Sequence, residues 1–171
     1  MAVSYEMTST FGKKLESAAG RLCELLIPIK YEYHVGEGKT VAICTLSSID
    51  LLETIARNTD IMSKILVVGR LLSENRGIDT LIKFAVKYPD LRYIIICGNE
   101  VKGHKSGQAL LSLYRNGTNK DGRIIGATGP NPFLTSSQTD IEFFRRQTQI
   151  YNLIGSKDLR VIKAQLSIFC Q

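Results

Sequence analysis

The sequence has no tryptophan, only four prolines and only two histidines among its 171 residues. It has no Gly/Ser/Pro-rich tract and no internal repeat, so nothing indicates a disordered linker or a repeat array. The apolar runs, such as residues 93–97, are far shorter than the roughly 18 residues needed to cross a bilayer, and no signal-like segment opens the chain. We therefore expect a cytoplasmic protein with one folded domain at residues 36–171, preceded by a helix and an extended lead-in at residues 1–35.

The cysteines and the basic residues do not form the patterns of a zinc site or of a nucleic-acid-binding surface. The four cysteines are widely separated and give no zinc-binding spacing, and Cys44 and Cys97 fall inside apolar runs where a thiol acts as a small hydrophobe. The net charge is +6, but the basic residues are scattered and are not interleaved with aromatics. A solvated basic surface is thus favoured over nucleic-acid binding, and we expect no nucleic-acid partner.

Motifs of common cofactor and hydrolase sites are missing. The first predicted strand leads into Thr45-Leu46-Ser47-Ser48, which lacks the glycines that hold a dinucleotide pyrophosphate. There is no Gly-x-Ser-x-Gly elbow and no Cys-His-Asp arrangement. Nicotinamide binding and hydrolysis by a catalytic triad are therefore disfavoured.

Short β-branched runs alternate with helical stripes along the chain. The patterns predict strands at residues 40–46, 65–69, 91–97 and 123–128, and helices at residues 11–26, 51–57, 78–86, 108–115, 140–153 and 157–169. The run at 65–69 is too uniformly apolar for a strand with one wet face. This alternation predicts a three-layer α/β fold with a mainly parallel sheet.

Four loops then meet at the carboxyl edge of the sheet, where open α/β sheets bind ligands: residues 45–48, 69–77, 98–107 and 127–133. His104 lies in the third loop between Gly103 and Gly107, so a bulky group can approach closely and an imidazole nitrogen can bind a transition metal. A histidine here can instead bond the backbone or cap the next helix. The same choice between helix capping and ligand contact applies to Glu74 and Asn75.

These segments together resemble a known family. Residues 40–46, 68–78, 97–108 and 124–133 are similar to the cobamide-binding A subunit of tetrahydromethanopterin S-methyltransferase, and the most specific part is Glu100-Val101-Lys102-Gly103-His104. The resemblance implies a Rossmann-like domain that binds a cobamide, with His104 as the lower axial ligand of cobalt. It also implies a methyl carrier: the cobalt takes a methyl group from a methylated pterin and passes it to the thiol of coenzyme M, with partner methyltransferase subunits supplying both substrates.

We predict that the four loops form the cradle of the cobamide. Phe133, between Pro132 and Leu134, is interpreted as a packed lid. The predicted cofactor-binding residues are Thr45, Leu46, Gly69, Leu71, Glu74, Asn75, Gly98, Glu100, Val101, Gly103, His104, Gly107, Gln108, Ala127, Thr128, Gly129, Pro132 and Phe133. The flanking glycines suit a loop that moves as His104 binds and releases cobalt.

The common corrinoid pattern Asp-x-His-x-x-Gly is only half present, because Lys102 replaces the acid before His104. We expect Glu100 to supply the carboxylate that tunes the imidazole. Family members in the membrane complex carry a C-terminal hydrophobic anchor, whereas this chain ends at Gln171 without one, so we expect a soluble relative or a truncated form. The alternative is a non-enzymatic α/β module that uses the same crevice for another ligand or for protein contact.

Overall fold

The computed structural model describes residues 33–169, so the helix predicted at residues 11–26 lies outside the described residues. The strands are β1 (Tyr33–Val35), β2 (Val41–Cys44), β3 (Val67–Gly69), β4 (Tyr93–Gly98) and β5 (Gln149–Ile154). The helices are α2 (Ile49–Ala56), α3 (Thr59–Met62), α4 (Arg76–Lys87), α5 (Ser106–Asn116), α6 (Gln138–Gln147) and α7 (Leu159–Phe169).

The five strands form one mixed sheet in the order β1-β3-β2-β4-β5. The central strand β2 is parallel to β3, with Ile43 opposite Val68, and parallel to β4, with Ile43 opposite Ile95. β5 also runs parallel to β4, and only the edge strand β1 is antiparallel. The prediction of an α/β fold with a mainly parallel sheet is confirmed.

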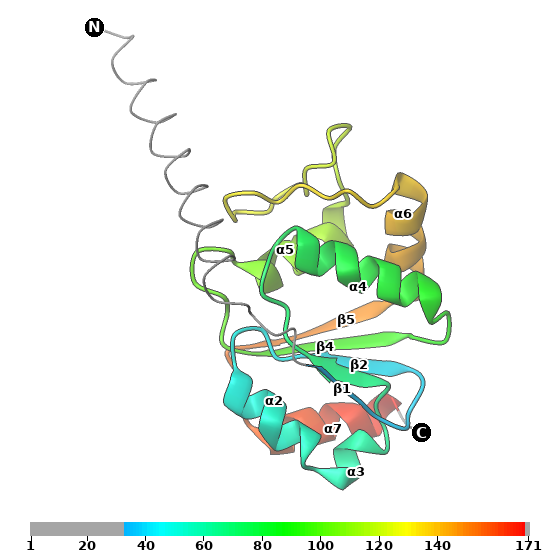
Figure 1. Ribbon diagram of the computed structural model, residues 1–171, viewed down its shortest axis with the longest axis vertical. Helices are drawn as coiled ribbons and strands as arrows, with labels where there is room; N and C mark the ends of the chain where they lie inside the picture. Colours follow the sequence, from blue (N-terminus) through cyan, green and yellow to red (C-terminus); the bar gives the residue numbers. More distant parts are fainter. Residues whose placement is uncertain (1–32, 170–171) are drawn as a thin grey trace, which may run out of the picture. The chain divides into compact units, whose positions relative to one another are not determined.

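Each face of the sheet has its own apolar core, because successive strand residues point to opposite sides. Ala42, Cys44, Ile94 and Ile96 pack with side chains of α4, α5 and α6. Val41, Ile43, Val68, Ile95 and Cys97 pack with side chains of α2, α3 and α7. Figure 1 shows these two groups of helices on opposite sides of the strands. Burial on both faces explains why these strands read as continuous apolar runs.

The two central thiols lie in these cores. Cys44 and Cys97 are buried and free, as predicted. Loss of solvation by burial raises the pKa of each thiol to about 12. Both therefore stay protonated near neutral pH and act as packing residues.

The C-terminal third differs from the prediction in two places. The strand expected at residues 123–128 is wrong: Gly126 has a φ of +84°, and only isolated bridges, Thr118 with Ile124 and Arg123 with Phe133, occur there. The helix expected at residues 140–153 is wrong beyond Gln147, because the chain turns at Thr148 and enters β5. We call residues 117–137, which connect α5 to α6, the excursion.

The chain order creates a topological switch at the carboxyl edge. From β2 the chain passes to β3 on one side, and then returns to β4 on the other side of β2. The carboxyl ends of β2 and β4 are thus the point where parallel α/β sheets bind ligands.

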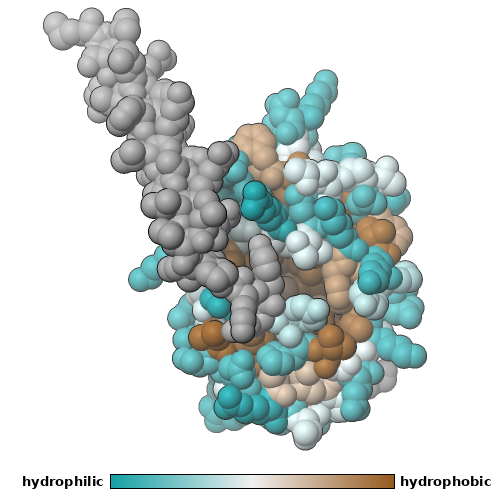
Figure 2. All heavy atoms as spheres, in the orientation of Figure 1, coloured by the Kyte–Doolittle hydropathy of each residue, from teal (hydrophilic) through white to brown (hydrophobic). Residues whose placement is uncertain are grey.

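Within the described residues, no helix combines the length and the apolarity that a membrane span requires. The face drawn in Figure 2 mixes polar side chains with several separate apolar groups.

Candidate functional site

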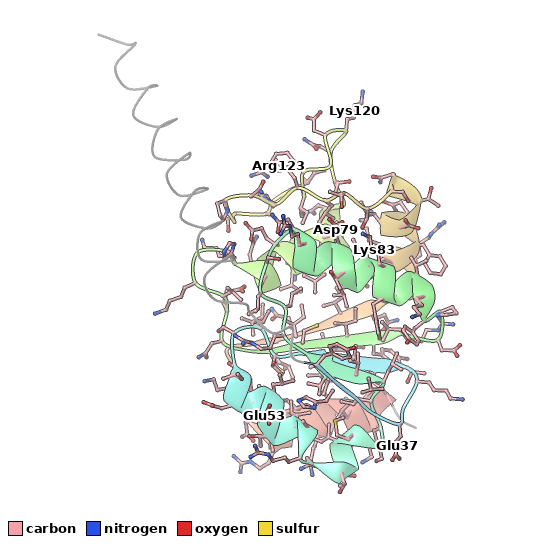
Figure 3. The ribbon with its side chains drawn as sticks, in the orientation of Figure 1. Glu37, Glu53, Asp79, Lys83, Lys120 and Arg123 are labelled. Carbon is pink, nitrogen blue, oxygen red and sulfur yellow. The ribbon has the colours of Figure 1, made fainter. Side chains whose placement is uncertain are left out.

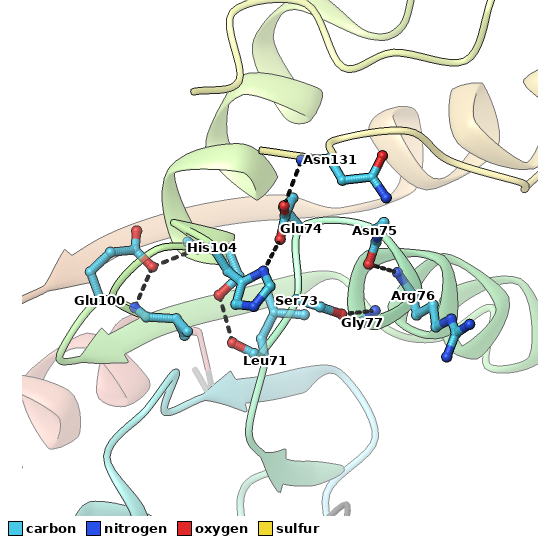
Figure 4. Close-up of polar contacts among 12 residues, drawn as sticks. Leu71, Ser73, Glu74, Asn75, Arg76, Gly77, Glu100, His104 and Asn131 are labelled. Atoms are coloured by element: carbon cyan, nitrogen blue, oxygen red, sulfur yellow. Dashed lines mark hydrogen bonds and ion pairs between the residues drawn. The ribbon is translucent and has the colours of Figure 1, made fainter. Parts of the chain in front are cut away.

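The centre of the site is a contact between two loops. His104, between β4 and α5, places Nδ1 2.7 Å from Oε2 of Glu74, which precedes α4. The Glu74 side chain is only 1% exposed, whereas that of His104 is 54% exposed (Figure 4). A carboxylate accepts hydrogen bonds, so Nδ1 carries the hydrogen, and in the neutral form of the ring Nε2 then keeps its lone pair. This is the arrangement by which a carboxylate orients a metal-binding histidine.

Glu74 also holds a third loop. Its Oε1 accepts a hydrogen bond of 2.9 Å from the backbone N–H of Asn131 in the excursion. A Cβ on Gly129 would lie 2.4 Å from the carbonyl oxygen of His104 and 3.0 Å from Cγ of Glu74, so the backbones meet closely here. Glu74 therefore joins the His104 loop to the excursion.

The role expected for Glu100 was wrong, and helix capping, one of the two alternatives for Glu74, is not observed. Glu74 does not cap α4; that helix is capped by Ser73, whose Oγ accepts from Gly77 N–H, and by Asn75, whose Oδ1 accepts from Arg76 N–H. Asn75 therefore caps α4, and its contact with a ligand stays a prediction. Glu100, which we expected to tune His104, instead accepts from the backbone of Val101, Gly107 and Gln108. Glu74, thirty positions before the histidine, is instead the carboxylate that contacts the imidazole.

Gln108 and Asp79 fix the excursion on either side of Glu74. The Gln108 amide donates to Gly126 O at 2.9 Å and accepts from Thr128 N–H at 3.0 Å. Asp79 is buried on α4. Its carboxylate accepts from four groups, the backbone N–H and the hydroxyl of both Thr135 and Ser136, at distances of 2.6 to 2.9 Å. Figure 3 shows Asp79 on α4 below the excursion that carries Lys120 and Arg123.

Burial raises the pKa of Asp79, but the hydrogen bonds from Ser136 and Thr135 outweigh it, and the net pKa lies below the ordinary value of 3.8. Asp79 is thus a charged anchor at neutral pH. No local pattern in the sequence marks it, because its partners lie 56 and 57 positions away.

The turn after β2 is tied to the loop after β4. Ser47 Oγ donates to Asn99 O at 2.9 Å, and Ser48 Oγ accepts from Asn99 N–H at 2.8 Å. Ser48 stands at the N-cap position of α2 but makes no side-chain capping bond, because both serine side chains bond the neighbouring loop instead. Leu46 is buried with a φ of +51°, a conformation that is strained for a bulky residue.

Thr45 supplies an unexplained polar atom in the same turn. Its side chain is fully buried, and Oγ1 has no hydrogen-bond partner within the part of the chain that the structure describes. Such orphaned groups are rare in native proteins and call for a reason.

The other predicted residues also lie along this edge. Leu71 O accepts from Ser106 Oγ at 2.7 Å, a contact that sequence reasoning missed. Gly69 ends β3, and Gly98 ends β4 with a φ of +78° and would place a Cβ 2.5 Å from Thr45 O. Val101 packs on the core from the His104 loop, while Ala127 and Pro132 are buried in the excursion. A Cβ on Gly103 would meet nothing within 4 Å.

Phe133 is not the packed lid that we expected. It is 43% exposed, and the Arg123 guanidinium carbon lies 6.0 Å from its ring centroid. The hydrogen bonds described above bring the four loops together. The ring of Phe133 does not close over them and is left open to solvent.

The donor set can be compared with what a cobamide needs. A metal held in a tetrapyrrole-type ring takes only axial ligands from protein, as haem iron takes a proximal histidine. No three His, Cys, Asp or Glu side chains within residues 33–169 gather as a metal cluster. An exposed imidazole with its Nδ1 fixed by a buried carboxylate fits the single axial position.

Comparison with known proteins agrees with the motifs. Residues 24–170 match the model of the MtrA family, the A subunit of tetrahydromethanopterin S-methyltransferase. The chain belongs to this family. The MtrA protein numbered 1 in Methanothermobacter thermautotrophicus is 40% identical over 102 residues, which are 58% of this chain and 43% of that protein.

Other members of the MtrA family align over more of the chain. The MtrA protein of Methanosarcina acetivorans is 33% identical over 140 residues, 81% of this chain and 56% of that protein. The MtrA protein numbered 2 in Methanothermobacter marburgensis is 33% identical over 138 residues, 79% of this chain and 71% of that protein. The chain thus spans about half the length of the first two relatives, 43% and 56%.

Proposed function

We propose that this chain binds a cobamide at the carboxyl edge of its sheet and serves as the methyl-carrying subunit of a tetrahydromethanopterin S-methyltransferase-type complex. The observation that carries the proposal is the contact of His104 Nδ1 with buried Glu74, in a side chain that is itself half exposed and has Nε2 as its second ring nitrogen. Membership of the MtrA family supports the same assignment.

In this proposal each loop has a task. His104 offers Nε2 as the lower axial ligand, and Glu74 fixes the tautomer and direction of the ring. The turn after β2, with the Thr45 hydroxyl that has no partner among residues 33–169, and the excursion from Ala127 to Phe133 line the remaining walls. The bound cobamide supplies the cobalt that accepts and releases a methyl group.

The substrates would reach the cobalt through partner subunits. The resemblance that motivates the proposal names a methylated pterin as donor and the thiol of coenzyme M as acceptor. Residues 36–171 would form the cobamide-binding domain, and catalysis would be shared with the partner methyltransferase subunits.

Cobinamide gives a direct test, because this corrinoid lacks the nucleotide tail and brings no lower base of its own. The protein is loaded with cobinamide under anaerobic conditions, reduced to the cobalt(II) state and examined by electron paramagnetic resonance. We expect nitrogen superhyperfine triplets that become doublets when the histidines carry ¹⁵N.

The two histidines of the chain provide the matched pair of variants. His104→Ala should abolish the nitrogen coupling, whereas His34→Ala should preserve it, because His34 lies on β1 and faces Glu53 at 3.7 Å. Coupling that is absent from the wild type, or that persists in His104→Ala, would rule out the proposed axial ligand. Failure of the wild type to bind any corrinoid would favour the α/β binding module.

A further inference from the structure

One side chain closes the loop that carries His104. Glu100 follows β4, and its Oε1 accepts hydrogen bonds from Val101 N–H at 2.8 Å and Gly107 N–H at 3.0 Å. Its Oε2 accepts from Gln108 N–H at 2.8 Å. Figure 4 shows Glu100 at the base of this loop, on the far side of His104 from Asn75 and Arg76. A single carboxylate therefore joins the start of the loop to the first turn of α5.

This carboxylate replaces an ordinary helix cap. The N-cap residue of α5 is Lys105, which has a left-handed φ of +48° and makes no side-chain capping bond. The free N–H groups and the positive end of a helix dipole attract an anion, and in α/β proteins this position often holds a ligand phosphate. Here the anion comes from the chain itself, so the start of α5 is already occupied.

The loop is packed tightly around Glu100. A Cβ on Gly107 would lie 3.0 Å from Glu100 Oε2 and 3.1 Å from a methyl carbon of Leu46. Inside the loop, Lys105 N–H donates to Val101 O at 2.8 Å. Among these contacts the Glu100 carboxylate is the one that carries charge, and it spans both ends of the segment.

We propose that Glu100 is a positioning residue for His104. Its negative charge at the start of α5 holds residues 101–107 in the conformation that brings the imidazole to Glu74. Only the choice of corrinoid as a probe rests on the function proposed above. Gly103 and Gly107 flank His104 in this loop. The loop is held while Glu100 keeps its hydrogen bonds to Val101, Gly107 and Gln108, and it is free to move when they break.

The first test uses the protein without any corrinoid. Long-range ¹H–¹⁵N spectra of the imidazoles report which ring nitrogen carries hydrogen. We expect one fixed tautomer for His104 in the wild type, and a mixture of both in Glu100→Gln, which keeps an amide oxygen but loses the charge. The matched control is Asp158→Asn, because Asp158 likewise accepts a backbone N–H at the start of a helix, from Arg160 of α7.

The second test asks whether an external anion replaces the side chain. Cobinamide affinity should fall about 10-fold in Glu100→Gln, within the range seen when the support of a metal ligand is removed. In Glu100→Ala, added formate should restore both the fixed tautomer and the affinity, and in the wild type it should change neither. If Glu100→Ala does not fold, Glu100→Gln decides the matter alone.

The outcomes separate the two proposals. If Glu100→Gln lowers the melting temperature but leaves the His104 nitrogens and the cobinamide affinity as in the wild type, Glu100 is a helix cap only and the inference is overturned. If the wild type binds no cobinamide, the proposed function fails, while the imidazole spectra still decide the role of Glu100.

Discussion

Glu74 and His104, thirty positions apart in the chain, meet at 2.7 Å with the carboxylate inside the protein and the ring at its surface. Burial shields the carboxylate from competing water, so the hydrogen bond to Nδ1 is strong and directional. The pair connects the loops after β3 and β4, and the second Glu74 oxygen adds the excursion. One buried carboxylate thus sets the relative positions of three segments at this edge.

Glu74→Gln should weaken cobinamide binding by about 10-fold to 100-fold, because the amide loses the negative charge and keeps only one oxygen for the two N–H groups, of His104 and Asn131, that Glu74 binds. The measurement is a visible absorption titration at constant pH. Glu53→Gln is the matched control, since Glu53 faces His34 at 3.7 Å across an exposed surface. An affinity within twofold of the wild type in Glu74→Gln would contradict the proposed orientation of the ring.

Asp79→Asn should lower the free energy of unfolding by about 2 kcal/mol at pH 7, because hydrogen bonds to a charged group are lost and an amide N–H₂ faces other donors. The pKa of Asp79 is lowered in the folded state, so its stabilisation is present above the ordinary value of 3.8 and is lost as the pH falls through the lowered value.

Urea unfolding of the wild type and Asp79→Asn at a series of pH values checks both points. The difference between the two proteins should shrink below pH 3.8. Asp50→Asn, at an exposed position in the first turn of α2, is the control and should change the free energy little at any pH. A difference that grows on acidification would show that Asp79 is not the charged anchor described here.

Gly129→Ala should displace His104, because the new Cβ would lie 2.4 Å from His104 O, a backbone atom. We expect loss of the nitrogen coupling to cobinamide cobalt and a lower melting temperature. In Gly77→Ala, the new Cβ would meet only side-chain atoms at close range, of Leu71 at 3.0 Å and Ser73 at 3.2 Å, so His104 ligation should persist. Equal effects of the two substitutions would count against the close approach at Gly129.

Native Cys44 and Cys97 should react with a disulfide reagent only after unfolding. With a pKa of about 12, about one thiol in ten thousand is ionised at pH 8, and both are buried. The experiment uses Cys23→Ser/Cys170→Ser, so that only these two thiols are counted. Fast stoichiometric labelling in the absence of denaturant would disprove the burial.

Most of the fold could be predicted from the spacing of apolar residues along the sequence and from the length of the apolar runs. The β-branched segment at Ile94 to Cys97 and the stripe of Ile78, Ile82 and Ala85 on α4 fill the positions that their patterns indicate. β5 could not, because Ile150, Tyr151 and Leu153 also suit a helical stripe. Pairing with β4, a contact between distant segments, decides the strand.

The site was predictable only at the level of its loops. Glycines at strand ends and the motif around His104 mark the edge, but nothing local links Glu74 to that histidine or Asp79 to Ser136. These contacts depend on how α4, α5 and the excursion pack. For the same reason Glu100, which belongs to the motif itself, was given the role that Glu74 has.

The excursion is fastened at Gly126 and Thr128 by Gln108, at Asn131 by Glu74, and at Thr135 and Ser136 by Asp79. Its tip near Lys120 precedes all of these attachments and is exposed. A fluorophore or affinity tag carried at Lys120 would therefore report on this protein in a mixture while leaving the attached half of the segment as it is.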